Sequence, residues 1–215
     1  MKSVLITGGT VRIGKAIAER LRDEGWRVIT SSHRADAGAD IVADLAEPMG
    51  AAKLYAAALQ ILGGMPPDAL VNNAALFTGD DAAIAAVNLE APKKLTMLMA
   101  GRETGVGAVV NILDAKALDG NRLQLTAVDS YRNSKRELQA FTRASASTFA
   151  ATLRVNGVAP GPVMAPINVH EKAGEMLLDR RPTANDIAAA VSYLLSAEAV
   201  TGAILPVDAG QHLIP

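Results

Sequence analysis

Cysteine is absent from the 215-residue sequence, and aromatic residues make up only 3% of it. The absence of cysteine excludes disulfides, thiolate zinc sites, iron–sulfur clusters and cysteine nucleophiles together. A folded chain of this length buries about 70% of the surface that its unfolded form exposes, so it needs neither a metal nor a disulfide to hold it together. Because half of the residues are hydrophobic but few are aromatic, the core must be built from Ala, Val, Ile and Leu.

Neither sign of charge dominates, since 21 Lys and Arg residues stand against 22 Asp and Glu, a net charge of −1. Like charges do not cluster along the chain, which disfavours nucleic acid and anionic membranes as partners. The sequence also lacks an uninterrupted apolar run of about 18 residues, the length that spans a bilayer. Met1 and Lys2 lead directly into an apolar segment, which leaves no room for a signal peptide. We therefore expect a cytoplasmic protein.

Short apolar runs alternate with longer helical stretches along the whole chain. Most of the short runs are continuous and not alternating, which is typical of parallel strands covered on both faces. The pattern predicts an α/β fold: a Rossmann-type doubly wound parallel sheet of about seven strands, with helices on both faces, in a single domain over residues 1–215. We expect strands at residues 4–7, 27–31, 41–43, 69–72, 108–113, 152–156 and 203–207, and helices at 12–24, 49–62, 80–102, 127–150 and 184–195, the last capped by Thr183.

A glycine-rich turn follows the first expected strand. Such a turn brings backbone N–H groups and the positive end of a helix dipole towards the pyrophosphate of a dinucleotide. Gly8 and Gly14 would supply the permissive backbone and the close helix–strand approach, and Arg12 would add a cation for charge-assisted hydrogen bonds. The alternative is a turn that serves packing only. The segment reads Thr7-Gly8-Gly9-Thr10-Val11-Arg12-Ile13-Gly14.

The second expected strand ends in Ser31-Ser32-His33-Arg34. In dinucleotide-binding folds an acid at this point binds the ribose 2′-hydroxyl, whereas a nearby Arg accommodates a 2′-phosphate. The first acid here is Asp36, after Arg34, so we expect NADPH in preference to NADH. The alternative is a solvated surface turn. The link to the next strand is too short for a crossover helix, so we expect it to be mostly irregular. Asp44, after the third strand, is either a helix N-cap or an adenine contact.

Tyr131 and Lys135 lie four residues apart in an expected helix, and therefore on one face of it. A phenol has a pKa of about 10, and a cation within roughly 4–6 Å can lower that pKa by about 1–3 units. Tyr131 would then serve as a general acid. The alternative is an ordinary pair of surface residues.

In their order and spacing these motifs resemble the short-chain dehydrogenase/reductase family over essentially the whole chain. The resemblance implies a cofactor-binding half over residues 1–113, a catalytic and substrate half over 114–215, and a homo-oligomer, either tetramer or dimer, acting on a small molecule. It rests on Thr7–Gly14, Asp44-Leu45, Asn72-Asn73-Ala74-Ala75, Asn88, the pair Tyr131 and Lys135, Pro160-Gly161 and Val207-Asp208-Ala209-Gly210.

The resemblance also implies roles for individual residues. Lys135 would hold the nicotinamide ribose of NADPH, and Asn88 would anchor a water in a proton relay. The Thr that family members carry after Pro-Gly is missing, and the backbone of Val163 could replace it. The expected cofactor contacts are Gly8, Thr10, Arg12, Ile13, Gly14, Ser32, His33, Arg34, Asp44, Leu45, Asn73, Ala74, Ala75, Tyr131, Lys135, Pro160, Gly161 and Val163.

Two departures from the family pattern narrow the subgroup. Most members have Gly where this chain has Arg12, and a catalytic Ser where it has Asp114. Both substitutions resemble the pteridine reductases, which include bacterial dihydromonapterin and dihydrofolate reductases. In that group a carboxyl can hydrogen-bond pterin ring nitrogens or help to deliver a proton, and an aromatic at the position of Phe77 stacks on the pterin. The expected substrate contacts are therefore Arg12, Phe77, Asp114 and Tyr131, with Asp114, Tyr131, Lys135 and Asn88 as the catalytic set.

Other interpretations stay open. The same fold and cofactor would serve a carbonyl reductase acting on a 3-oxoacyl thioester or a small ketone, and a non-catalytic NADP-binding module would keep the glycine turn without the chemistry. Phe77 could also be a core residue. Asp114 and Tyr131 stand further apart in sequence than is usual for the family, so residues 119–122 are expected to bulge outward, and residues 164–181 form a compact substrate segment.

Overall fold

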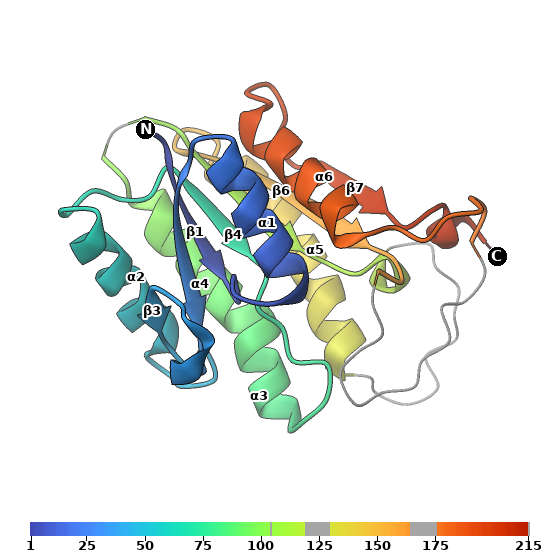
Figure 1. Cartoon of the computed structure of the whole chain (residues 1–215), viewed down its shortest axis with the longest axis horizontal. Helices are drawn as coiled ribbons and strands as arrows, with labels where there is room; N and C mark the ends of the chain where they lie inside the picture. The colour runs from blue at the N-terminus through green and yellow to red at the C-terminus, as the bar shows by residue number, and fades with distance from the viewer. Residues whose placement is uncertain (104, 119–129, 164–175, 215) are drawn as a thin grey trace.

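The computed structural model describes residues 1–103, 105–118, 130–163 and 176–214, and its strands form one seven-stranded sheet (Figure 1). Neighbouring strands are all parallel, in the order β3-β2-β1-β4-β5-β6-β7. The order reverses between β1 and β4, as in a doubly wound sheet, which confirms the predicted Rossmann-type α/β fold. The strands are β1 (Ser3–Thr7), β2 (Arg27–Ser32), β3 (Ile41–Val42), β4 (Ala69–Asn72), β5 (Gly107–Ile112), β6 (Leu153–Pro160) and β7 (Ile204–Val207).

Helices cover both faces of the sheet (Figure 1). The long ones are α1 (Arg12–Asp23), α2 (Gly50–Ile61), α4 (Ala91–Ala100), α5 (Ser130–Thr148) and α6 (Ala184–Ser196). The shorter ones are α3 (Asp81–Ala85), η2 (Ala86–Glu90), η1 (Ala35–Ala37), η3 (Ala115–Ala117) and η4 (Gln211–Leu213).

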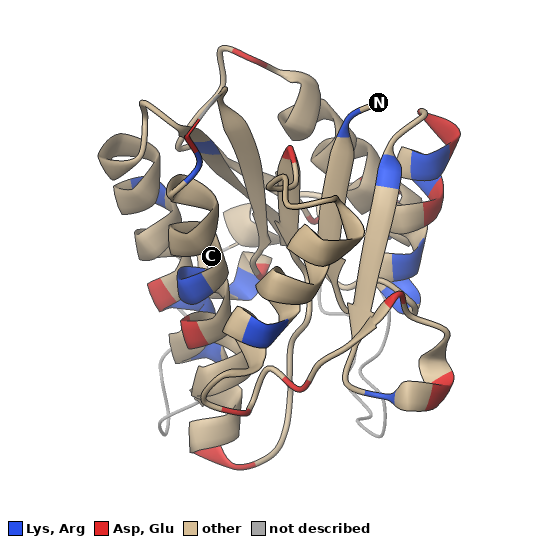
Figure 2. Cartoon of the chain, turned by 90° about the vertical axis from the view of Figure 1, so that its left-hand side faces the viewer, with Lys and Arg blue, Asp and Glu red and all other residues tan. Residues whose placement is uncertain are grey.

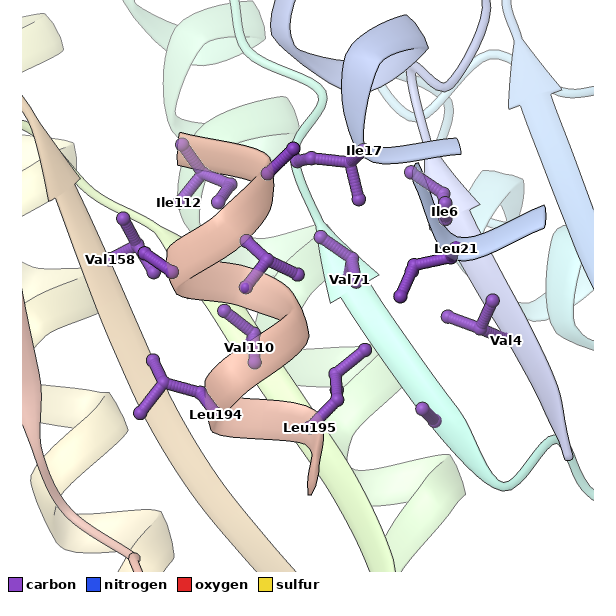
Figure 3. Close-up of a cluster of buried hydrophobic side chains, with 14 of the residues drawn as sticks. Val4, Ile6, Ile17, Leu21, Val71, Val110, Ile112, Val158, Leu194 and Leu195 are labelled. Carbon is purple, nitrogen blue, oxygen red and sulfur yellow. The ribbon is translucent and has the colours of Figure 1, made fainter. Parts of the chain in front are cut away.

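Each face of the sheet carries its own hydrophobic core. Along β1, Val4 and Ile6 belong to one cluster and Leu5 to the other, because successive side chains of a strand point to opposite faces. Figure 3 shows the first cluster, where α1 and α6 pack on the strands; α2, α4 and part of α5 cover the second face. Burial on both faces explains why the strands read as continuous apolar runs.

The prediction of one continuous helix over residues 80–102 is wrong in the middle of that range. It is divided into α3, the π-helical turn η2, and α4, with Asp80 as the N-cap that accepts a hydrogen bond from the Ala83 N–H at 3.2 Å. Pro92 stands in the first turn of α4. Its missing N–H and its ring disrupt the α-helical bond to the carbonyl four residues earlier, that of Asn88, which accounts for the wider turn.

The strand expected at residues 152–156 is longer than predicted, because β6 extends to Pro160. Its last four residues pair with β7, from Gly157 opposite Ile204 to Pro160 opposite Val207. A Cβ at Gly157 would lie 2.7 Å from the Leu113 side chain, so glycine permits close packing here and does not end the strand. Pro160 is tolerated because the pairing of β6 with β5 ends before it, so its missing N–H leaves no hydrogen bond of that ladder unmade.

The link between β2 and β3 is short and irregular, as predicted, and holds only the single turn η1. The start of the helix expected at 127–150 lies outside the described residues, and its described part is α5. Figure 2 shows basic and acidic residues interspersed on the side that it presents, in keeping with the net charge of −1. Among the residues that the structure describes, every helix is too short or too polar to cross a bilayer.

Candidate active site

Asp114, Tyr131 and Lys135 meet beyond the carboxyl end of β5. Asp114 starts η3, where its Oδ1 accepts a hydrogen bond from the Lys116 N–H at 2.8 Å. The phenol of Tyr131, in the first turn of α5, donates to Asp114 Oδ2 at 3.0 Å. One turn further, the Lys135 Nζ donates to the Ile112 carbonyl at 2.8 Å and lies 5.9 Å from the centre of the Tyr131 ring. The strand end and the helix thus hold a carboxyl, a phenol and an amine in one cluster.

Burial shapes the electrostatics of this cluster. It raises the pKa of the Asp114 carboxyl above its usual range, against the hydrogen bonds from Lys116 and Tyr131 and the charge of Lys135. Burial also lowers the pKa of the Lys135 ammonium from 10.5 to about 8, and the nearby Asp114 charge opposes that change. At neutral pH Lys135 is therefore a buried cation, while the carboxyl of Asp114 binds a proton more readily than an exposed one. Pairs of groups perturbed in this way cluster at functional sites.

Phe77 completes this end of the site. It lies on the loop after β4 and its ring centre is 4.7 Å from that of Tyr131, with the planes tilted by 58°. The side chain is 39% exposed, so the alternative that Phe77 is a core residue is wrong. An accessible aromatic face therefore stands directly beside the phenol.

The side-chain amide of Asn88 links the loop that carries Phe77 to α5. Its Oδ1 accepts from the Leu76 N–H at 2.8 Å, and its Nδ2 donates to the Leu76 carbonyl at 2.9 Å and to the Ser134 hydroxyl at 3.2 Å. The π-helical turn places this buried amide between the Phe77 loop and α5. Both of its N–H donors are used in these contacts, so the side chain positions the loop and the helix. The role of Asn88 in anchoring a relay water stays a prediction.

The turn between β1 and α1 is built for a close approach. Gly8 has a left-handed φ of 62°, and the Asn73 Nδ2 donates to the carbonyls of Thr7 and Gly8, both at 3.0 Å. A Cβ at Gly14 would lie 2.1 Å from the Gly8 carbonyl oxygen. Val11 stands at the N-cap of α1, and its apolar side chain cannot cap the first turn. These features fit a phosphate group that would accept from the first backbone N–H groups of α1.

Arg12 also has a left-handed backbone, with φ of 53°. An L-residue other than Gly is penalised there, by roughly 1–2 kcal/mol. A position that glycine would occupy without strain thus carries a cation in the turn between β1 and α1.

Arg34, two residues after β2, forms an ion pair that the sequence did not predict. Its Nε donates to Asp36 Oδ1 at 2.9 Å and its Nη2 to Asp36 Oδ2 at 2.6 Å. The Arg34 N–H donates to the Ser32 hydroxyl at 3.1 Å. The only signal in the sequence was the two-residue spacing of a basic and an acidic residue.

Asp44 does not cap a helix, so that alternative is wrong. Its Oδ1 accepts from the Ala46 N–H at 2.8 Å in a local turn, and Met49 is the N-cap of α2. A Cβ at Gly50 would lie 1.9 Å from the Asp44 carbonyl, so glycine lets α2 begin against this turn. Asp44 is exposed at the same sheet edge, whereas the Leu45 side chain is buried in the core.

Most of the remaining expected cofactor residues also lie after strand ends, whereas Ile13 lies in α1. Gly161 follows β6 and packs against Asp208, since a Cβ there would lie 2.6 Å from the Asp208 Cα. Asp208 is itself buried and accepts from the His212 Nδ1 at 2.8 Å, a pair that the sequence motif did not reveal. Residues 119–122 and most of 164–181 lie outside the described residues. Thr10 lies in the turn after β1, and Ile13 is partly buried against the hydrophobic cluster that α1 and α6 cover. His33 follows β2, Ala74 and Ala75 follow β4, and Val163 comes two residues after Gly161.

Comparison with known proteins places the chain among oxidoreductases. A family model described as enoyl-(acyl carrier protein) reductase matches residues 10–212. Glucose 1-dehydrogenase 2 of Bacillus subtilis is 30% identical over 250 residues, which cover 100% of this chain and 96% of the relative. The NADP-dependent (R)-specific alcohol dehydrogenase of Lentilactobacillus kefiri is 29% identical, covering 97% of this chain and 96% of the relative.

Among solved structures, FolM alternative dihydrofolate reductase 1 from Brucella canis, complexed with NADP, superposes with a TM-score of 0.84 at 32% identity. The match covers 100% of this chain and 95% of that one. Together with the family model and the relatives, it shows that the chain belongs to the short-chain dehydrogenase/reductase family, as its motifs predicted.

Proposed function

We propose that this protein reduces a C=N bond in a pterin-type ring, such as a dihydropterin or dihydrofolate, with Tyr131 as the general acid. The family assignment makes the chain an NADP-dependent dehydrogenase/reductase, and the proposal concerns its substrate. The observation that supports it best is the Asp114 carboxyl bonded to the Tyr131 phenol at 3.0 Å, beside the exposed ring of Phe77.

The chemistry of Asp114 favours a nitrogen-containing ring over a simple carbonyl. A carboxyl group can accept hydrogen bonds from ring N–H and amino groups, and when protonated it can donate one. A carboxylate beside the phenol would repel the negative oxygen that develops when a ketone is reduced. Phe77 would stack on the flat ring, a contact that contributes about 0.5–1.5 kcal/mol beyond burial.

Reduction of a C=N bond adds a hydride to carbon and a proton to nitrogen. NADPH, when bound, supplies the hydride. The Tyr131 hydroxyl would donate the proton to the substrate nitrogen, and in the structure Asp114 accepts its hydrogen bond. Lys135, fixed by the Ile112 carbonyl, places a positive charge beside the phenol and stabilises the negative oxygen left after proton transfer. The raised pKa of Asp114 suits this carboxyl to return a proton to the phenol.

The residues around the first two strands fit the cofactor. The turn at Gly8 and Gly14 and the first N–H groups of α1 would hold the pyrophosphate, and Arg34 would hold the 2′-phosphate. Residues 1–113 would thus serve mainly the cofactor and residues 114–215 catalysis and substrate. Phe77 crosses this division, because its ring contacts Tyr131 of the second half.

A second candidate is a carbonyl reductase. Its support is the similarity over nearly the whole chain to an alcohol dehydrogenase at 29% identity. Asp114 separates the two candidates, because its negative charge opposes an alkoxide but suits a ring nitrogen.

The test is to follow NADPH oxidation with dihydrobiopterin, dihydrofolate and a 3-oxoacyl thioester in parallel. We expect turnover with a pterin, its loss in Asp114→Ser, and a gain of activity on small carbonyls in that variant. Pterin turnover that survives Asp114→Ser would refute the role of the carboxyl. Turnover of the thioester alone would establish the carbonyl reductase instead.

A further inference from the structure

We propose that Asp36 is a built-in competitor for the 2′-phosphate of the cofactor: it occupies the Arg34 guanidinium and so weakens the preference for NADPH over NADH. The inference rests on the NADPH site described under the proposed function. It assigns to Asp36 the role of setting how strongly that site selects its cofactor.

Arg34 binds the Asp36 carboxylate in the geometry in which a guanidinium binds an anionic ligand. Arg34 Nε and Nη2 each donate to a different oxygen of Asp36, at 2.9 and 2.6 Å. Two parallel bonds of this kind are the way in which a guanidinium also binds phosphate. The side chains are 62% and 70% exposed, so both ions remain open to an incoming ligand.

The local backbone holds the pair in place. Arg34 precedes the turn η1, its N–H donates to the Ser32 hydroxyl, and Gly38 ends the turn with a left-handed φ of 65°. Asp36 lies within this turn, only two residues from Arg34. Its carboxylate therefore stays close to the guanidinium even when a ligand displaces it.

The other acid of this link is already committed elsewhere. Asp40 Oδ2 accepts from the Thr30 N–H and from the Thr30 hydroxyl, both at 2.7 Å, and so it completes the edge of β2. The contact that concerns the 2′ position of the cofactor is thus the one between Arg34 and Asp36.

Competition follows from the charges. A 2′-phosphate that binds Arg34 must first displace the Asp36 carboxylate, and it then meets a like charge a few ångströms away. A 2′-hydroxyl has no such conflict, because a carboxylate accepts its hydrogen bond. Since an exposed ion pair is weak, we expect the effect on affinity to be modest, about two- to fivefold.

The experiment measures equilibrium binding to the full-length protein by titration calorimetry. The probes are 2′,5′-ADP, which carries the 2′-phosphate, and 5′-AMP, which lacks it. Asp36→Asn is expected to lower the Kd for 2′,5′-ADP by about two- to fivefold without tightening 5′-AMP. In an Arg34→Ala background the same change should give a smaller gain, because there is no guanidinium to release.

Asp23→Asn is the matched control. It removes one negative charge from the exposed end of α1, and it should leave both Kd values unchanged. An equal gain in this control would mean that overall charge, and not the Arg34 pair, explains the result, and would overturn the inference.

The two hypotheses can fail separately. If the wild-type protein prefers 2′,5′-ADP but Asp36→Asn leaves that Kd unchanged or raises it, Asp36 is not a competitor, while the NADPH assignment stands. If the wild-type protein shows no preference for 2′,5′-ADP over 5′-AMP, the Arg34 phosphate site itself is wrong, and the inference falls with it.

Discussion

Lys135 should make the stability of this protein depend on pH in a measurable way. Its side chain is 3% exposed, and burial lowers the pKa of its ammonium from 10.5 to about 8. Between these two pH values the unfolded chain keeps the proton that the folded protein has released. Stability therefore rises with pH across this window, and below pH 8 the folded protein bears the full cost of the buried charge.

The size of the effect follows from the two pKa values. A lowering from 10.5 to about 8 corresponds to about 3 kcal/mol of free energy of unfolding. Lys135→Met removes this titration. The free energy of unfolding of the wild-type protein, minus that of the variant, should therefore increase by about 3 kcal/mol between pH 7 and pH 10.5.

The assay is urea-induced unfolding of both proteins at several pH values in this range. Taking the difference between them cancels the groups that titrate alike in both. Lys15→Met is the control, because the Lys15 side chain is 61% exposed and its removal should give a difference that hardly changes with pH. A flat difference for Lys135→Met as well would refute the reasoning and show that the amine is hydrated in the folded protein.

Tyr131→Phe should abolish NADPH oxidation while calorimetry still detects NADPH binding, because only the proton donor is lost; substantial residual turnover would move the acid to Asp114. Phe77→Ala should raise the pterin KM about 2- to 12-fold in steady-state assays, and an unchanged KM would contradict stacking. Arg12→Gly should leave the free energy of unfolding in urea unchanged or raise it by up to about 1 kcal/mol, because relief of the left-handed strain exceeds or balances the added freedom of the unfolded chain; a loss would show that side-chain contacts of Arg12 outweigh the strain. Thr183→Ala breaks the capping box with Asp186 and should cost about 1 kcal/mol, a fall in Tm of roughly 2–4 °C by calorimetry, whereas an unchanged Tm would contradict it.

The layers of the fold could be predicted because the hydrophobic pattern of each strand matches its burial on both faces of the sheet. Val4, Leu5 and Ile6 are successive apolar residues, and only a strand covered on both faces buries all three. The end of β6 could not be predicted, because Gly157 and Pro160 usually interrupt strands. Both residues fit here because of contacts with Leu113 and with β7, which lie far from them in the sequence.

The same contrast holds for the site. Asp114, Tyr131 and Lys135 could be expected to meet, because a strand end and an i, i+4 pair fix their positions. The contact between Arg34 and Asp36 could not, since two loop residues can take many relative orientations and only the turn η1 selects one. The commitment of the Asn88 amide to Leu76 and Ser134 depends on tertiary contacts that no local pattern encodes.

The π-helical turn η2 accommodates one extra residue between α3 and α4. A turn of this kind holds one residue more than an α-helical turn, and each residue of an α-helix rotates its successor by about 100°. Because the wider turn takes up the extra residue, deleting a single residue such as Val87 would give a regular helix with α3 and α4 still in phase. Leu95 and Met99 would keep facing the core, and the change would fall on the turn that places the Asn88 amide. A regular α-helix through the full segment would instead rotate α4 by about 100° and turn Leu95 and Met99 out of the core. Homologous chains that lack this extra residue should therefore keep the buried stripe of α4 and differ at the amide contacts of Asn88.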